Sequence, residues 1–522
     1  MPAAPTALAL GRAAASTASG LAVAFAFPPY DLIWLMPFGL AGLMLTVRGD
    51  PRGATPLRGR SGLLQGFCFG MGFMLPLMRW ITIIGIDAWF ALAVLEALFY
   101  ALMGLTWAWL RPERWWPIGF AATWVGAESL RGVIPFGGLP WGSLAFGLVD
   151  TPMVRWGRVG GTALVSFVVV LVVAVLVDVV ERRDWGVRGL AGVGVALALA
   201  VGSAALPVGI AGAAGTTQVA AVQGNVPGEG MNPFAERRAV LDNHATATVD
   251  FAARVRAGQA VAPDVVIWPE NSTDIDPYSD ASAYEEIDSA VRAIGVPTLV
   301  GAVVDGPGPD HVRNMGIVWS PTTGPGEQYV KRHPVPFGEY IPFRGLLTKF
   351  ITRLDQIPRD FARGTFDSVL DLGPVKVGDV ICFEVAYDGL VRDAIEGGGQ
   401  MLVVQTNNAT YTGTGQLEQQ FAISRYRAIE TGRTVVVAAT DGISGIIAPD
   451  GSVVAQTEEK TRAVLDENVE LGEGITWGLR AGPWVEAGLC ALALVAVGLV
   501  LLRRPNRTTR LGRRSAPAKI DA

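Results

Sequence analysis

The sequence predicts a bundle of eight membrane-spanning helices that carries one α/β domain outside the cytoplasm. Seven long apolar stretches precede residue 213, and an eighth lies at 486–502. Between them, short β-rich runs alternate with helical patterns over residues 213–485. Charged residues make up only 17% of the chain, whereas a soluble domain usually has about 25%. This deficit indicates that much of the chain lies in lipid.

The apolar stretches account for the predicted bundle. The first seven run over 7–27, 31–47, 62–84, 87–110, 116–134, 161–180 and 189–212. A helix needs about 20 residues to cross the hydrocarbon core of a bilayer, and each stretch reaches or approaches that length. We therefore divide the chain into a seven-span region at 1–212, a domain at 213–485, an eighth span at 486–503 and a basic tail at 504–522.

Arginines between the apolar stretches predict the orientation of the bundle. They gather after the second, fourth and sixth stretches and in the tail, at Arg48, Arg52, Arg58, Arg60, Arg111, Arg114, Arg182, Arg183, Arg188, Arg503, Arg504, Arg507, Arg510, Arg513 and Arg514. Positive residues of short loops stay in the cytoplasm, and eight spans put all of these on that side. The domain is then extracytoplasmic, the C-terminal tail is cytoplasmic, and the expected location is the cell membrane.

The central segment predicts a layered α/β sandwich, because its strands alternate with helices and hairpins. The expected strands are Gln218–Gln223, Val265–Trp268, Thr298–Val304, Gly316–Trp319, Val375–Cys382, Leu402–Thr406 and Val435–Ala439. Helical patterns at Arg237–Ala257 and Gln416–Thr431 lie between some of them. The domain therefore has the alternation expected of sheets covered by helices.

Charge and cysteine content exclude several classes of protein. A net charge of −5 argues against nucleic acid as a partner. The three cysteines are Cys68, Cys382 and Cys490, and the first and last lie in apolar runs. The three histidines have no pair at metal-ligand spacing. We therefore expect neither a disulfide framework nor a metal site.

Glu270 follows an apolar strand and a proline, in the segment Val265–Asn271. A carboxylate at the tip of a strand is suited to proton transfer when it is partly removed from water. Alone, such a glutamate is more often a surface residue or a helix cap.

Lys331 precedes a loop dense in proline and glycine, Tyr329–Pro342, with Glu339 eight positions later. An ammonium held by a rigid loop can stabilise a thiolate and a developing oxyanion. A lone lysine after a strand is more often simply solvated.

Cys382 ends the strand Val375–Cys382, and Val385–Glu396 then has a helical pattern. A cysteine at a strand-to-helix turn lies near the positive end of the helix dipole, which lowers the pKa of its thiol. The alternative is a buried cysteine that packs as a small apolar residue. The neighbouring Phe383 and Glu384 are untypical of a purely apolar core.

Together, these three residues in this order resemble the nitrilase superfamily, whose members use a Glu–Lys–Cys triad on an α-β-β-α sandwich. A nitrilase-like domain inserted before the last of eight spans is similar to a narrower family, the apolipoprotein N-acyltransferases. The resemblance covers nearly the whole chain. Further matching segments are Val222–Pro227, Phe136–Trp141, Arg425–Glu430 and, most specifically, Pro336–Tyr340.

The resemblance implies an acyltransferase. The enzyme would take an acyl chain from a membrane phospholipid, hold it as a thioester, and pass it to the α-amino group of the lipid-modified N-terminal cysteine of a diacylated apolipoprotein. Cys382 would be the nucleophile, Glu270 the general base and acid, and Lys331 the charge stabiliser. Glu339 and Glu384 would support the triad. The backbone N–H of Phe383 would join Lys331 in the oxyanion hole, and no metal or organic cofactor is implied.

Some positions depart from the family pattern. Asn232 stands near where relatives often have a tryptophan, Asn407–Tyr411 replaces Asn-Asp-Ala-Trp-Phe, and Phe383 replaces a common tyrosine. These changes concern the walls of the acyl or peptide pocket, so they affect substrate preference. The preferred phospholipid, acyl chain and lipoproteins, and the oligomeric state, do not follow from the sequence.

Two further features carry predictions. Apolar residues from Phe343 to Leu354 follow helical spacing with cationic flanks, so this segment is either a lid on the membrane surface or a helix packed on the domain. Glu96 and Glu128 lie within predicted spans, and Arg131 is one turn from Glu128, which predicts a structural ion pair.

Two other functions are compatible with parts of the sequence. A membrane-tethered nitrilase-type amidase would use the same triad on a small amide, although a soluble substrate needs only one anchor. Such an enzyme needs a polar mouth, whereas an acyltransferase needs an apolar one open to lipid. A non-catalytic transporter or receptor with a nitrilase-like binding domain predicts a broken triad, and all three residues are present.

Overall fold

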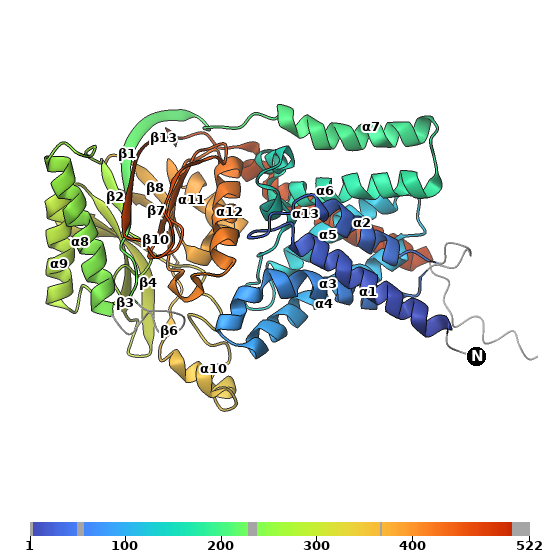
Figure 1. The fold of residues 1–522 in the computed structure, drawn as a ribbon, viewed down its shortest axis with the longest axis horizontal. Helices are drawn as coiled ribbons and strands as arrows, with labels where there is room; N and C mark the ends of the chain where they lie inside the picture. The colour runs from blue at the N-terminus through green and yellow to red at the C-terminus, as the bar shows by residue number, and fades with distance from the viewer. Residues whose placement is uncertain (1–3, 50–56, 228–236, 366–367, 504–522) are drawn as a thin grey trace, which may run out of the picture.

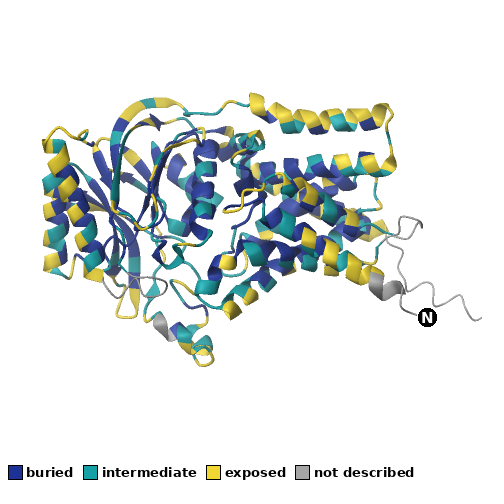
Figure 2. Cartoon of the chain, in the orientation of Figure 1, coloured by how far each residue is buried: buried dark blue, intermediate teal, exposed yellow. Residues whose placement is uncertain are grey.

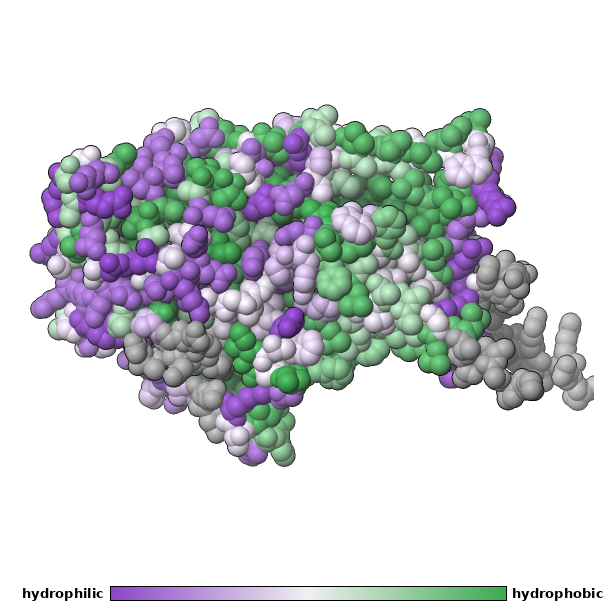
Figure 3. Space-filling model, viewed as in Figure 1, coloured by the Kyte–Doolittle hydropathy of each residue, from purple (hydrophilic) through white to green (hydrophobic). Residues whose placement is uncertain are grey.

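A computed structural model describes residues 4–49, 57–227, 237–365 and 368–503. Its helical region and its α/β domain lie side by side along the long axis of the molecule (Figure 1). The predicted basic tail at 504–522 and Asn232 lie outside the described residues. A mostly hydrophilic surface covers the α/β end, and apolar residues dominate the visible face of the helical end (Figure 3).

Eight helices form the bundle, one for each predicted apolar stretch. They are α1 (Ala4–Ala24), α2 (Leu35–Thr46), α3 (Gly59–Leu77), α4 (Ile86–Leu110), α5 (Trp116–Arg131), α6 (Gly157–Arg182), α7 (Val187–Gly202) and α13 (Trp477–Arg503). Within the described residues, four segments are long and apolar enough to cross a membrane: Ile86–Leu110, Pro152–Arg182, Val187–Ala205 and Trp477–Arg503. The helical part of the fold prediction is therefore confirmed, while the number of spans stays a prediction.

Glycines allow helices α3 and α4 to approach closely. A Cβ at Gly66 would lie 2.0 Å from the Tyr100 carbonyl oxygen, and one at Gly104 would lie 2.4 Å from the Gly62 oxygen. Small residues at such spacing let helix backbones pack tightly where lipid gives no hydrophobic driving force. The glycines of α3 and α4 therefore allow these two helices to make the most extensive helix–helix contact in the bundle.

Two sheets form the centre of the α/β domain. The first has the order β13-β1-β2-β3-β4-β5, with β6 beside β4, and the second has the order β12-β11-β10-β9-β8-β7. The first contains β1 (Ala213–Gln223), β2 (Val265–Ile267), β3 (Thr298–Asp305), β4 (His311–Ser320), β5 (Gly324–Val330), β6 (Asp360–Phe361) and β13 (Ala463–Gly472). The second contains β7 (Val369–Asp371), β8 (Lys376–Ile381), β9 (Met401–Thr406), β10 (Val435–Ala439), β11 (Gly445–Ile447) and β12 (Val453–Gln456).

Helices cover the outer face of each sheet, which completes the predicted α-β-β-α sandwich. Helices α8 (Arg237–Arg256) and α9 (Ala281–Ile294) lie outside the first sheet, and α11 (Asp388–Glu396) and α12 (Gln416–Thr431) outside the second (Figure 1). One apolar core fills the space between the sheets and another lies under α8 and α9. The third core runs from α12 into the membrane bundle without a break. The second sheet and the bundle therefore belong to one continuous core of buried residues (Figure 2).

Three local predictions are wrong. The amphipathic segment Phe343–Leu354 is not one helix, because only α10 (Arg344–Leu347) and a 3-10 turn at Thr352–Gln356 form. The helix after Cys382 is split into a 3-10 turn, Cys382–Ala386, and α11.

The third concerns the ion pair within the bundle. Arg131 pairs with Glu96, at 3.1 Å between Nη1 and Oε2, rather than with Glu128. Glu128 instead accepts a hydrogen bond from the indole of Trp124 at 2.9 Å. Helical spacing predicted the nearest acid in sequence, but packing of α4 on α5 brings Glu96 closer.

Candidate active site

The ends of three strands position the predicted triad. Glu270 lies three residues beyond β2, Lys331 immediately follows β5, and Cys382 immediately follows β8. Glu270 and Lys331 are buried, with 4% and 2% of their surface exposed. Cys382 is partly buried. The two sheets thus bring residues that are far apart in sequence to one site.

Lys331 connects two carboxylates. Its Nζ lies 2.9 Å from Glu270 Oε1 and 2.8 Å from Glu339 Oε1. Burial alone would lower the pKa of this ammonium, but the charges of Glu270 and Glu339 outweigh burial and hold the pKa well above its usual range. Lys331 is therefore a permanent cation, and the predicted partner Glu339 belongs to the same buried network.

Two groups that the sequence analysis did not connect with Glu270 hold it in place. The side-chain amide of Asn314 on β4 donates to Glu270 Oε1 at 2.6 Å and to Glu339 at 3.1 Å. The backbone N–H of Asn407 donates to Glu270 Oε2 at 2.7 Å. Asn314 lies beside Arg313 in a strand of mixed polar and apolar residues, so the sequence offered no signal for its role.

Cys382 adopts a left-handed backbone conformation, with φ at +55°. Such a conformation is costly for a residue with a side chain and is concentrated at functional sites. The sulfur accepts a hydrogen bond from the Thr406 hydroxyl, with 3.3 Å between the two atoms. The strand-to-turn geometry therefore fixes the direction of the thiol.

The resting thiol of Cys382 is neutral. Burial, followed by the charge of Glu270, raises the pKa of the thiol to about 12, although Lys331 acts in the opposite direction. The expectation that the following helix would lower this pKa is wrong, because only a five-residue 3-10 turn follows. A base is therefore needed to generate the thiolate during the reaction.

Glu384 organises the backbone around the site. Its carboxylate accepts hydrogen bonds from the N–H groups of Ile381, Arg332 and His333 at 2.7–2.9 Å and from the Tyr329 hydroxyl. One side chain thus ties the strand that carries the thiol to the loop that carries the ammonium. This arrangement fits the supporting role that the resemblance implies for Glu384.

Aromatic side chains from the bundle pack against Phe383, the residue after Cys382. The Phe383 ring stacks on Trp141 with 4.7 Å between centroids, and Trp141 contacts Trp80 at 5.8 Å. Trp80 in turn meets the ring of Tyr411 edge-on at 5.1 Å. The departures from the family pattern at Phe383 and Tyr411 therefore lie in an apolar wall beside Cys382.

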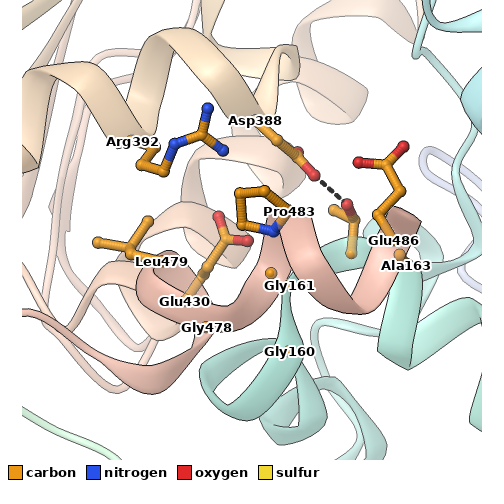
Figure 4. A pocket seen from close by; sticks show the side chains of 12 residues that line it. Gly160, Gly161, Ala163, Asp388, Arg392, Glu430, Gly478, Leu479, Pro483 and Glu486 are labelled. Carbon is orange, nitrogen blue, oxygen red and sulfur yellow. Dashed lines mark hydrogen bonds between the residues drawn. The ribbon is translucent and has the colours of Figure 1, made fainter. Parts of the chain in front are cut away.

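Buried charges join the domain to the bundle behind this wall. Arg427 donates to the carbonyls of Val385 and Ala386 and pairs with Asp388 and Glu430. Asp388 also accepts a hydrogen bond from Thr162 of α6. Thr162, Asp388 and Glu430 line a cavity of about 20 Å³ (Figure 4), which has room for about one water molecule. A larger cavity of about 340 Å³ adjoins it, lined by Glu128 and Arg131 of α5 and by Tyr387 and Asp388 of the domain.

Comparisons with known proteins agree with this arrangement. Residues 19–175 match the family model of the apolipoprotein N-acyltransferase N-terminal domain, and residues 218–478 match that of the carbon-nitrogen hydrolases. The apolipoprotein N-acyltransferase of Mycolicibacterium smegmatis is 40% identical, over 97% of this chain and 88% of that protein. The one from Chromobacterium violaceum is 30% identical, over 94% of each.

Among solved structures, an amidase from Nesterenkonia sp. is similar, at 18% identity and a TM-score of 0.35, over 52% of this chain and 95% of that one. The family models and the identity to the two curated relatives show which group the chain belongs to. It is a member of the apolipoprotein N-acyltransferase family, with a carbon-nitrogen hydrolase domain at residues 218–478.

Proposed function

We propose that this membrane enzyme transfers an acyl chain from a phospholipid, through a thioester on Cys382, to the α-amino group of the diacylglyceryl-cysteine of an apolipoprotein. The observation that carries this proposal is the position of Cys382. The thiol faces the charges of Glu270 and Lys331, and the next residue, Phe383, stacks on Trp141 of the helical region. Groups suited to acyl transfer and an apolar aromatic surface therefore lie close together around Cys382.

In the first half-reaction, Glu270 takes the proton of the thiol as Sγ attacks the carbonyl carbon of the phospholipid ester. The charge that develops on the carbonyl oxygen is stabilised by the Lys331 ammonium and the backbone N–H of Phe383. The ester C–O bond then breaks, and Glu270 returns the proton to the departing glycerol oxygen. The products are a lysophospholipid and a thioester on Cys382.

In the second half-reaction, the amine of the apolipoprotein attacks the thioester carbonyl. Glu270 accepts a proton from the amine, an amide bond forms, and the sulfur leaves and regains a proton. A covalent intermediate divides one difficult transfer into two easier steps. Glu270 serves both steps because Asn314 and Asn407 hold both of its oxygens in place.

The apolar surroundings support a lipid substrate over a small amide. The aromatic wall lies on the bundle side of the thiol, and exposed apolar side chains continue near the site at Phe337 and Phe343. Phe136, from the loop after α5, contacts both of these rings at about 6 Å between centroids. A small polar amide has no use for such a surface, whereas an acyl chain does.

The proposal includes a membrane orientation. Eight helices match the eight apolar stretches, and the arginine-rich loops follow the second, fourth and sixth of them. With eight spans, the positive-inside rule puts these loops in the cytoplasm and the catalytic domain outside. This is the side on which a lipoprotein with a lipid-modified N-terminal cysteine would be met.

The proposed function is tested with purified enzyme, a phospholipid labelled in its acyl chains and a synthetic diacylated lipopeptide. We expect the lipopeptide to gain one labelled acyl group in an amide bond that resists hydroxylamine. Cys382→Ala should abolish this gain, whereas Cys490→Ala should retain it, because Cys490 lies on α13 away from the triad. Release of ammonia from small amides without any lipopeptide product would instead favour the amidase.

A further inference from the structure

Asp379 is a buried acid without a partner. It lies in β8, three residues before Cys382, and none of its surface is exposed. Among the described residues, no donor reaches either of its carboxylate oxygens. An ionised carboxylate in such a place would cost several kcal/mol, so a buried acid without a cation takes the neutral form.

The structure makes room for this acid between the two sheets. Gly316 of β4 faces it, and a Cβ at that position would lie 2.3 Å from Asp379 Oδ2. The same point is 2.7 Å from Gln405 Oε1. Asp379 and Gln405, from the neighbouring strands β8 and β9, therefore direct oxygens into one small space under a glycine.

Among the described residues, no donor reaches the side-chain oxygen of Gln405. Its Nε2 donates to the carbonyl oxygen of Trp268 at 2.6 Å, and this contact fixes the orientation of the amide because a carbonyl can only accept. Gln405 Oε1 is buried and, within the described part of the chain, accepts no hydrogen bond. The O–H of a protonated Asp379 is the group that would satisfy it.

We propose that Asp379 is a protonated acid that donates a hydrogen bond to Gln405 and thereby positions Glu270 relative to Cys382. Trp268 lies two residues before Glu270, and Asp379 lies three residues before Cys382. The chain Asp379–Gln405–Trp268 thus links the strand that carries the nucleophile to the strand end that carries the base. Asp379 is a positioning residue, because it acts through Gln405 rather than on the substrate.

The surrounding charges favour the protonated form. The titratable groups that face Asp379 are Glu384 after β8, Glu270 after β2 and Tyr329 on β5. Burial, reinforced by the charges of Glu384 and Glu270, raises the pKa of Asp379 well above its usual range. A further carboxylate beside these two would repel both, whereas a neutral acid does not.

The inference is tested first by infrared spectroscopy, which does not depend on the proposed function. The difference spectrum between wild type and Asp379→Asn should contain the C=O stretch of a protonated carboxylic acid that shifts in D₂O. Absence of that band at neutral pH would overturn the inference, whatever acyl transfer shows.

The second test rests on the proposed function and measures the rate of thioester formation on Cys382 in a single turnover. Asp379→Asn keeps a donor and should stay near the wild-type rate, whereas Asp379→Leu should be about 100-fold slower, as expected when a base is slightly misplaced. The apparent KM for phospholipid should not change. Gln405→Met, which removes the acceptor, should match Asp379→Leu.

Val377→Ala is the matched control, because Val377 lies two residues earlier on the same face of β8 and packs between the sheets. It should lower the melting temperature with little effect on rate. A folded Asp379→Leu enzyme with the wild-type rate, or Asp379→Asn as slow as Asp379→Leu, would overturn the positioning role. No acylation by wild type would refute the proposed function and leave the infrared result to decide the protonation of Asp379.

Discussion

The resting charges of the triad residues determine how the thiol is activated. Cys382 is a neutral thiol whose pKa is raised to about 12, and Lys331 is a buried ammonium. Glu270 sits beside that ammonium as its ion-pair partner. A neutral nucleophile beside a base is unreactive until substrate arrives, which protects the thiol from adventitious modification.

Glu270→Gln should separate thiol reactivity from catalysis. The charge of Glu270 raises the pKa of Cys382, so its removal should lower that pKa and speed alkylation by iodoacetamide at pH 8. Acyl transfer should instead fall about 10²- to 10⁴-fold, because the proposed general base is lost. Rates of alkylation against pH check the first effect. The exposed Glu285→Gln is the control, and an alkylation profile equal to that of wild type would contradict the account.

Lys331→Met should destabilise the domain. It leaves Glu270 and Glu339 facing each other without the cation that both contact. Loss of one member of a buried ion pair costs about 3–5 kcal/mol. Thermal unfolding in detergent measures this loss, and adding Glu339→Gln should recover part of it. Lys349→Met, at an exposed position, should have no effect; an unchanged melting temperature for Lys331→Met would refute the ion-pair network.

The sequence predicted which three residues share the candidate site better than it predicted their electrostatics. Glu270 and Cys382 each follow an apolar strand, Lys331 precedes a loop dense in proline and glycine, and the order of the three matches one superfamily. The direction of the Cys382 pKa shift depends on burial and on the distance to Glu270, which are set only by tertiary packing. The same holds for Asn314, whose role depends on β4 lying next to the site.

At the scale of elements, the loop between α5 and α6 couples the bundle to the site. Its Trp141 stacks on Phe383 and donates to the Gln419 side chain of α12 at 2.7 Å. Trp141 is only 1% exposed. One residue of the helical region therefore packs directly against the turn Cys382–Ala386.

Trp141→Ala should weaken the contact between bundle and domain. Removal of a buried tryptophan costs about 3–5 kcal/mol, and the turn at Cys382–Ala386 loses its apolar support. Trp141→Phe keeps a ring for stacking and should recover most of the stability. Differential scanning calorimetry of both variants in detergent checks this order. Equal melting temperatures for Trp141→Ala and wild type would show that the stacking does not stabilise the protein.

Elements with a strong periodic pattern were predictable, and short ones were not. Every predicted apolar stretch contains a helix, because length and composition alone determine that outcome. The segment Phe343–Leu354 had helical spacing but forms only one short helix and a turn. Its Arg344 pairs with Asp360 and its Arg353 with Asp87, and these tertiary contacts override the pattern.

At the scale of the whole molecule, the domain and the bundle form one packed unit. Their shared apolar core and the buried Arg427 network join the second sheet to helices α5, α6 and α13. The site therefore has a fixed position relative to the apolar helices. An enzyme that draws one substrate from lipid needs such a fixed position, because its thiol must meet a chain held in the membrane.

The proposed orientation predicts which positions a membrane-impermeant maleimide reaches in intact cells. Gln259→Cys, on the exposed surface of the domain, should be labelled before lysis, and Arg183→Cys, in the loop after α6, only after lysis. The native cysteines are first replaced by serine in both variants. Labelling of Arg183→Cys in intact cells, with Gln259→Cys protected, would reverse the orientation.

The intact mass of the enzyme after incubation with a phospholipid and no acceptor shows whether Cys382 carries the acyl chain. We expect wild type to gain the mass of one acyl chain as a hydroxylamine-sensitive thioester and Cys382→Ala to gain nothing. A diacylated lipopeptide should then remove the added mass. If wild type forms no adduct while Cys382 remains free and alkylatable, Cys382 does not carry the acyl chain and the account is wrong.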